Sequence, residues 1–202
     1  MRSRGFTLVE VLVVVTISAI LIAAAVPSFQ WMMARNRVSD ATNLLLSNIE
    51  FARLEAVRRG NTVSICRTLN PNAPVATLAC SSASSATVDG NDWAAGWVVF
   101  EKVEPNVDEA NFEPNDRVIF RQQTVVGGAR VMIHLNIAAQ RVAYMPRGTG
   151  GFLGAGTFAI AYGQPASPVA MRAVSGLDGA ARCIPMSLLG SLRVARPAGG
   201  VC

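Results

Sequence analysis

The sequence predicts an α+β fold, in which one long N-terminal helix crosses a membrane with its first half and packs on antiparallel β-structure with its second. Three observations predict it: an apolar run over residues 6–26, an apolar stripe at helical spacing before Gly60, and a series of short strand-like segments after it. The remaining segment, 61–202, is long enough for one globular domain but not for two.

The apolar run 6–26 has the length of a transmembrane helix. At about 1.5 Å per residue it reaches about 30 Å, the thickness of a bilayer's hydrocarbon core. Arg2 and Arg4 precede it, so the positive-inside rule predicts a cytoplasmic N-terminus and a globular domain on the opposite side. Its one acid, Glu10, would cost about 2.5–3.5 kcal/mol or more in mid-membrane, so a partner for it is expected.

The basic leader and the start of the apolar run resemble a class III prepilin signal, the N-terminus of type IV pilins and type II secretion pseudopilins. The resemblance implies that a prepilin peptidase removes residues 1–5 by cleaving after Gly5 and methylates the new N-terminus, Phe6. Glu10, then the fifth mature residue, would direct subunits into a filament. The α-amino group of a neighbouring subunit's Phe6, with a pKa of about 7.7–8.0, would supply the partner of Glu10.

Two other interpretations of the N-terminus are less favoured. An ordinary secretory signal peptide is supported by Ala23-Ala24-Ala25, which offers a small-residue cleavage pattern. A plain single-span anchor would need only the apolar run. Glu10 at the start of that run, the Gly5-Phe6-Thr7 junction and the helical pattern that continues beyond residue 26 favour the prepilin interpretation.

Residues 27–60 are predicted to continue the helix, so that it covers residues 6–59. Pro27 is expected to kink the helix without ending it. Arg58 and Arg59 suit the negative C-terminal end of the helix dipole, and Gly60 suits the position after the last helical residue. One face is an apolar stripe that needs a sheet to cover it, formed by Ala34, Val38, Ala41, Leu45, Ile49, Ala52 and Ala56.

The rest of the chain has the pattern of short strands separated by Gly, Pro, Asn and Ser. Antiparallel pairing is favoured, because parallel crossovers would need helices between the strands. The stretches 68–92 and 103–116 are rich in Asn, Pro, Ala, Ser and Asp and are predicted to be surface loops. Strands are predicted near 62–67, 94–102, 117–123, 129–135, 141–146, 157–163, 169–174, 182–187 and 191–196.

The β-rich part resembles the H-type pseudopilin family, which includes GspH, FimT and FimU. The resemblance rests on the helix end ARLEAVRRGNTVSIC at 52–66, the motif WAAGWVVF at 93–100, and closing segments at 182–184 and 190–194. It implies a type IV pilin-like fold and a minor rather than a major subunit. The two tryptophans of the motif are expected to be core aromatics at a strand start, where Gly96 relieves crowding.

Cysteine usage fits an oxidising compartment. The four cysteines allow three connectivities. We favour Cys66–Cys80 and Cys183–Cys202, because each closes a local loop worth about 3 kcal/mol in the chain-entropy model. The alternative is four free thiols in a cytosolic protein. A metal site is not expected, because the chain has no C-x-x-C pair and a single histidine, His134.

The sequence does not suggest an enzyme or a cofactor. No triad can be built around His134 alone, and the aspartates are scattered in predicted loops. The glycines between 148 and 156 lie between two predicted strands. They therefore suit a hairpin better than a strand-to-helix phosphate loop.

The charge balance leaves DNA binding open as a hypothesis. The chain carries +5 at pH 7 with a pI near 9.6, and loss of the leader with Arg2 and Arg4 would lower the charge to +3. A modest positive excess favours anionic partners such as DNA or lipid headgroups. Some FimT-type pilins bind DNA through a C-terminal G-R-x-R motif, but residues 190–193 read Gly-Ser-Leu-Arg. The candidates are therefore Arg193 and Arg196, with Arg172 or Arg182 on neighbouring strands.

The expected function is that of a minor pilin-like subunit. It would stay in the bacterial inner membrane, with its domain in the periplasm, until it assembles through its helix with other pilins or pseudopilins. Two machines compete: a type IV pilus, with this chain in a priming or tip complex for pilus assembly and motility, and a type II protein secretion system, with this chain as its H-type pseudopilin. The larger loops favour the pilus. A DNA receptor for natural transformation is the third hypothesis.

Overall fold

The structure is a computed structural model of the chain. It describes residues 7–80, 92–103, 111–123, 131–135, 141–151, 156–162, 181–187, 189–197 and 202.

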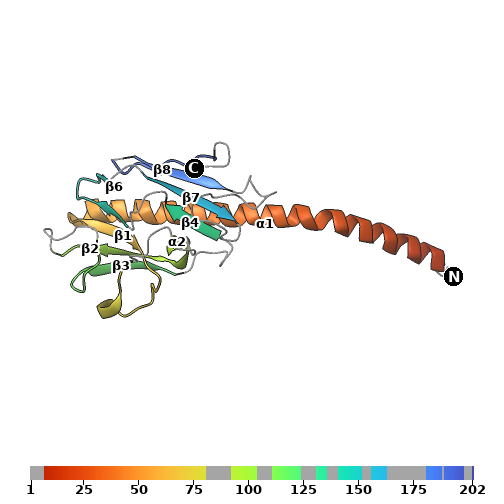
Figure 1. The fold of residues 1–202 in the computed structure, drawn as a ribbon, viewed down its shortest axis with the longest axis horizontal. Helices are drawn as coiled ribbons and strands as arrows, with labels where there is room; N and C mark the ends of the chain where they lie inside the picture. Colours follow the sequence, from red (N-terminus) through yellow and green to blue (C-terminus); the bar gives the residue numbers. More distant parts are fainter. Residues whose placement is uncertain are drawn as a thin grey trace, which may run out of the picture.

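One helix, α1 (Leu8–Arg59), runs from the N-terminal end into the globular domain (Figure 1). It begins after Thr7, whose hydroxyl accepts a hydrogen bond from the backbone N–H of Glu10 at 3.3 Å. It ends at Gly60, which has the left-handed φ of 68° and donates its N–H to the carbonyl of Ala56 at 3.0 Å. The helix is continuous through Pro27, as the sequence predicted.

Two antiparallel sheets cover the C-terminal half of α1 (Figure 1). The larger sheet has the order β3-β2-β1-β5-β6, and the smaller one has the order β4-β7-β8. This is the α+β arrangement that the sequence predicted. The strands are β1 (Val63–Arg67), β2 (Trp97–Glu101), β3 (Arg117–Gln122), β4 (Val131–Leu135), β5 (Arg141–Tyr144), β6 (Gly150–Gly151), β7 (Gly156–Tyr162) and β8 (Arg182–Met186).

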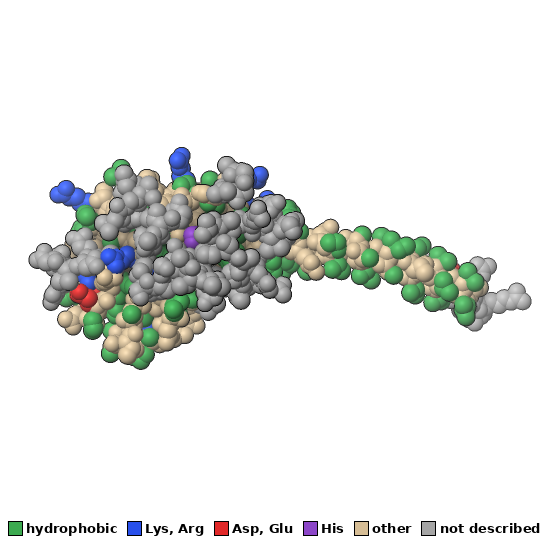
Figure 2. Space-filling model, viewed as in Figure 1, with side chains coloured by type: hydrophobic (Ala, Val, Ile, Leu, Met, Phe, Trp, Pro, Cys, Tyr) green, Lys and Arg blue, Asp and Glu red, His purple; other side chains and the backbone are tan. Residues whose placement is uncertain are grey.

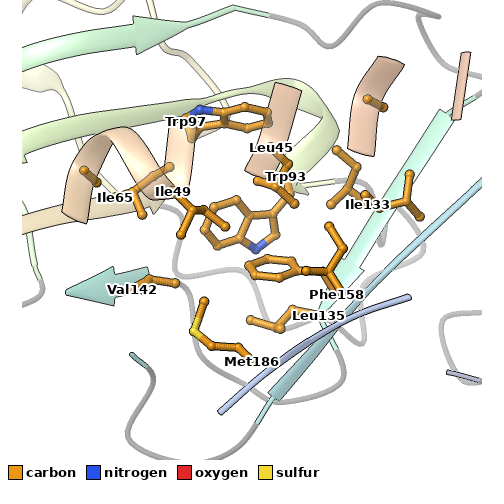
Figure 3. Packing of buried hydrophobic residues seen from close by; sticks show 14 of the residues in the cluster. Leu45, Ile49, Ile65, Trp93, Trp97, Ile133, Leu135, Val142, Phe158 and Met186 are labelled. Atoms are coloured by element: carbon orange, nitrogen blue, oxygen red, sulfur yellow. The ribbon is translucent and has the colours of Figure 1, made fainter. Parts of the chain in front are cut away.

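The core lies between the apolar stripe of α1 and the two sheets. All seven stripe residues predicted from the sequence are buried. Trp93 lies at the centre of the cluster, with Leu45 and Ile49 of α1 on one side and Phe158 of β7 on the other (Figure 3). The rings of Trp93 and Phe158 meet edge to face, with centroids 5.1 Å apart. Buried side chains of both sheets complete the cluster, including Ile65, Ile133 and Val142.

The segment that contains the two tryptophans differs from the prediction. A strand was expected over 94–102, but residues Asp92–Ala95 form the short helix α2 and the strand begins at Trp97. Gly96 separates them with a φ of 138°, which an L side chain rarely adopts. Trp93 is therefore a helical residue and Trp97 is the first residue of β2. Both side chains are fully buried, as expected.

The C-terminal segment also differs from the prediction. In place of a strand at 191–196, only two isolated bridges occur, Met186↔Leu192 and Cys183↔Ala195. Between them Arg193 donates its N–H to the carbonyl of Pro185 at 3.3 Å. Proline has no N–H to return, so the ladder is interrupted at that pair.

Other predictions differ in detail. The glycine-rich turn contributes β6, which pairs with β5, and the predicted loop 68–92 contains the 3-10 helix η1 (Val75–Thr77). The predicted strand at 169–174 lies outside the described residues.

Two disulfides tie down segments outside the sheets. Cys66–Cys80 joins β1 to the segment after η1, with an S–S distance of 2.04 Å. Cys183–Cys202 joins β8 to the C-terminal residue, with an S–S distance of 2.06 Å. These are the two pairings that the sequence analysis favoured. The first closes a small second cluster on the outer side of β1 and β2, which includes Leu78, Val98 and Phe100.

Candidate assembly site on the N-terminal helix

The candidate site is the N-terminal half of α1, the part that lies outside the described core of the domain. Every described residue from Thr7 to Met33 is exposed, and Ala34 is the first buried one. This half is long and apolar enough to cross a membrane. It projects away from the domain, and apolar side chains line the face that Figure 2 shows. The exposed large apolar residues occupy consecutive positions such as 11–15 and 20–22, so they cover every side of the helix. An apolar surface on every side of a helix requires lipid or other helices around it.

Glu10 is the one ionisable group in this apolar half. Its backbone N–H is used in the cap at Thr7, but among the described residues its carboxylate forms no hydrogen bond or ion pair. The first six residues, including Gly5 and Phe6, lie outside the described part of the chain. The geometry therefore presents an acidic group at the start of an apolar helix, where a cation from another molecule can reach it.

The two hydroxyl groups in the same region are satisfied within the helix. Thr16 donates to the carbonyl of Val13 at 2.9 Å, and Ser18 donates to the carbonyl of Val14 at 2.7 Å. Such bonds allow a hydroxyl to lie in a hydrocarbon environment. This leaves the carboxylate of Glu10 as the unmatched polar side chain of residues 8–26.

Pro27 lies between the apolar run and the part of α1 that enters the domain. Its ring nitrogen has no hydrogen, so the carbonyl one turn earlier, at Ala23, lacks its helical donor. The exposed half of α1 curves (Figure 1). The helix can therefore change direction near this point without being interrupted.

The far end of α1 is fixed to the larger sheet by a charged network. The carboxylate of Glu55 accepts hydrogen bonds from Arg58 at 2.7 and 2.8 Å and from Arg59 at 2.6 Å. Hydrogen bonding to Arg58, and then to Arg59, holds the pKa of Glu55 below its usual value. Arg59 also reaches Glu101 of β2 at 2.8 Å, and Asn61 donates to the same carboxylate at 2.7 Å. The C-terminal end of α1 is thereby held to β2.

The arginines proposed from the sequence for DNA, Arg193 and Arg196, are both exposed. They do not lie on a regular strand. Ala195 and Cys183 exchange backbone hydrogen bonds of 2.8 and 2.9 Å, and this register sets Arg196 opposite Arg182. Arg193 lies opposite Pro185, away from that pair. Arg172 lies outside the described residues.

Sequence reasoning missed the contribution of α1 to this basic region. Burial lowers the pKa of Arg182, and the positive charges of Arg35 and Arg196 lower it further. The antiparallel placement of β8 beside α1 was needed to find this relation. Within the described residues no three His, Cys, Asp or Glu side chains gather as a metal site would require.

Two family models match the sequence. Residues 41–179 match the family described as type II transport protein GspH. Residues 1–26 match the prokaryotic N-terminal methylation motif. A search of the curated proteins found no match.

Two solved structures are similar to this chain, and both are crystal forms of the type IV minor pilin FimU from Pseudomonas aeruginosa. The form in space group P21 is 16% identical and has a TM-score of 0.50, over 80% of this chain and 90% of that one. The form in space group P65 is 14% identical with a TM-score of 0.47, over 78% and 91% of the two chains. At this identity the likeness of the first structure shows a shared fold.

Proposed function

The chain belongs to the GspH/FimT/FimU family of type IV minor pilins and type II secretion pseudopilins, and from this premise we propose that it is a structural subunit assembled into a filament through α1. In this proposal the leader 1–5 is removed, residues 6–26 form the membrane and filament-core segment, and residues 27–60 carry the domain 61–202. The observation that carries the proposal is the exposed apolar half of α1 with the single acid Glu10, within the segment that matches the methylation motif.

The chemistry of assembly follows from the environment of Glu10. In lipid the carboxylate is costly, whereas in a bundle of such helices it can pair with the terminal amine of a neighbour. The apolar side chains lose little on leaving lipid for the bundle, since both environments are apolar. The pairing of charges therefore supplies the preference for a staggered assembly over dispersed monomers. Pro27 would let the helix adjust its direction between membrane and filament.

Processing at the leader is the first testable consequence. Mass spectrometry of the protein purified from membranes is expected to find a mature N-terminus at Phe6 that carries one added methyl group. In a strain without prepilin peptidase, the same analysis should find residues 1–5 retained. A mature protein that starts at Val26, after the small-residue run, would instead indicate an ordinary secretory signal and remove the basis of the assembly proposal.

We propose the type IV pilus as the machine, in a priming or tip complex that supports pilus assembly and motility, with the domain in the periplasm before assembly. The H-type pseudopilin of a type II secretion system is the alternative. A clean deletion separates them: loss of sheared surface pili with normal secretion is expected. Intact pili with secreted proteins retained in the periplasm would assign the chain to the secretion machine. The family match to type II transport protein GspH and the likeness in fold to a minor pilin are compatible with either outcome, so the deletion decides between them.

DNA binding in natural transformation is a second candidate function. It is supported by the exposure of Arg193 and Arg196 and by the closeness of Arg196 to Arg182. Against it, Ser191 stands where the family's DNA-binding motif has its first arginine. If the chain binds DNA, the full chain in detergent should retard the electrophoretic migration of a short duplex at about 50 mM salt. Arg193→Ala should then weaken this retardation.

A further inference from the structure

The segment of α1 between the apolar run and the domain carries large apolar side chains that the domain does not cover. The exposed fractions are 58% for Phe29, 38% for Trp31, 47% for Met32 and 36% for Met33. Ala34, the next residue, is the first that the domain buries. Because three of these side chains are consecutive, they point to different sides of the helix. Contact with water costs about 25 cal/mol per Å² of apolar area, so this segment favours a membrane or another apolar surface around it.

A cation lies close to the ring of Trp31. The guanidinium of Arg35, one helical turn further along α1, lies 5.5 Å from the centre of that ring. Helical side chains lean toward the N-terminus, and in α1 this direction leads away from the domain and toward the apolar half. Among the residues that the structure describes, Arg35 is exposed and forms no ion pair with an acid. An aromatic ring and a cation are thus presented together on one side of the helix.

The position of this pair along α1 matches the headgroup layer of a membrane. If residues 6–26 fill the hydrocarbon core, Trp31 lies about 7.5 Å beyond its edge, and the headgroup layer is about 5–8 Å deep on each side. The backbone of Arg35 lies about 13.5 Å beyond the edge, and its side chain reaches several Å back toward the lipid. Tryptophan prefers this layer because its ring is apolar and its N–H is polar, and arginine can bind lipid phosphate there.

We propose that residues 29–35 form an interfacial belt, in which Trp31 lies in the headgroup layer on the domain side of the membrane and Arg35 binds lipid phosphate. The inference rests on the proposed anchoring of α1 in the membrane. Lipid is favoured over the apolar helix of a neighbouring subunit, because an apolar helix would leave the charge of Arg35 without a counter-ion. The belt fixes the depth of α1, since inward movement would desolvate Arg35 and outward movement would expose the ring of Trp31 to water.

The test places the full-length chain in phospholipid vesicles that contain phosphatidylglycerol and measures the depth of Trp31. Trp31 is the exposed one of the three tryptophans, since Trp93 and Trp97 are fully buried. Lipids brominated near the headgroup end of the acyl chain are compared with lipids brominated near its methyl end, because bromine quenches tryptophan fluorescence only at short range. The shallow bromines are expected to quench the fluorescence about twofold more than the deep ones. Trp31→Phe should remove this difference.

A moved tryptophan separates this inference from the proposed anchoring. In Trp31→Phe/Thr16→Trp the indole lies near the middle of residues 6–26, so the deep bromines should quench its fluorescence more than the shallow ones. If this variant behaves so but native Trp31 is not quenched preferentially by the shallow bromines, the belt is overturned and the anchoring stands. If no lipid quenches the tryptophan at either position, α1 does not span the membrane and both proposals fail.

The contribution of Arg35 is tested by reversing its charge. Arg35→Glu should lower the shallow quenching of Trp31 about twofold, because lipid phosphate attracts a guanidinium and repels a carboxylate. Arg147→Glu is the matched control. It makes the same charge change at an exposed position beside Gly148, whose carbonyl accepts a hydrogen bond from Arg53 near the C-terminal end of α1. Equal losses in both variants would show a general effect of net charge, and no loss in either would likewise overturn the role of Arg35.

Discussion

Replacing Glu10 with alanine is expected to leave the chain in the membrane fraction but to exclude it from filaments. The substitution removes a group that costs about 2.5–3.5 kcal/mol in mid-membrane, so insertion becomes easier rather than harder. The neighbouring subunit's terminal amine then has no partner in the filament core, where an unpaired charge is strongly unfavourable. We expect at least a tenfold fall in recovery of the chain with its partner subunits, from solubilised membranes and from sheared filaments.

The matched control for this experiment is Thr16→Ala. Thr16 lies in the same apolar half, but its hydroxyl bonds within its own helix to Val13, so its loss should not affect assembly. Glu10→Gln separates charge from hydrogen bonding, because the amide keeps an acceptor but cannot form an ion pair. If Glu10→Ala assembled as well as Thr16→Ala, the pairing of Glu10 with a terminal amine would have to be abandoned.

Replacing Gly96 with alanine is expected to produce a large loss of stability for a single added methyl group. A Cβ at this position would lie 2.4 Å from the carbonyl oxygen of Gln122, which belongs to the backbone of β3 and cannot move alone. The φ of 138° is also unfavourable for any L side chain. Strain and overpacking together should cost about 3 kcal/mol or more, and lower the unfolding midpoint by about 10 °C.

Gly60→Ala tests whether that loss comes from the close approach to Gln122 or only from placing an alanine at a positive φ. Gly60 also has a positive φ, 68°, but no atom lies within 4 Å of the position of an added Cβ. Its replacement should therefore lower the free energy of unfolding only by the cost of a left-handed backbone for an L residue, about 1 kcal/mol. The unfolding midpoint should fall by about 3 °C. Thermal unfolding of both full-length variants in the same detergent measures the difference. Equal, small falls in the unfolding midpoint would mean that the backbone of β3 moves away at Gln122. The close approach to Gly96 would then not require glycine at that position.

The elements whose pattern is local were predictable from the sequence. The stripe from Ala34 to Ala56 specified a helix and its buried face, because helical periodicity depends only on neighbours three and four residues away. The alternation of Val131, Ile133 and Leu135 likewise specified the buried face of β4. Glu10 could be singled out from the sequence, since an acid in an apolar run is unusual wherever the chain folds.

The predictions that differed from the structure depended on a single backbone atom or angle. The start of β2 moved to Trp97 because Gly96 adopts a φ that ends the preceding helical turn. The last predicted strand became two bridges because Pro185, on the opposite segment, has no N–H to donate. Neither consequence can be read from composition, because the first requires the backbone angle at Gly96 and the second requires knowing which residue stands opposite in the sheet.

Features that depend on neighbouring residues were determined by the sequence, whereas features that depend on contacts between separate segments were determined only by the tertiary structure. Local pattern already specifies a membrane-length helix, its lone acid, the amphipathic continuation and a set of antiparallel strands. The placement of Arg196 opposite Arg182 does not follow from any local pattern, because it requires the bridge between Cys183 and Ala195. The two residues become neighbours only after this bridge has formed. Long-range pairing thus decides which charges lie side by side, because it alone brings residues of separate segments within reach of one another.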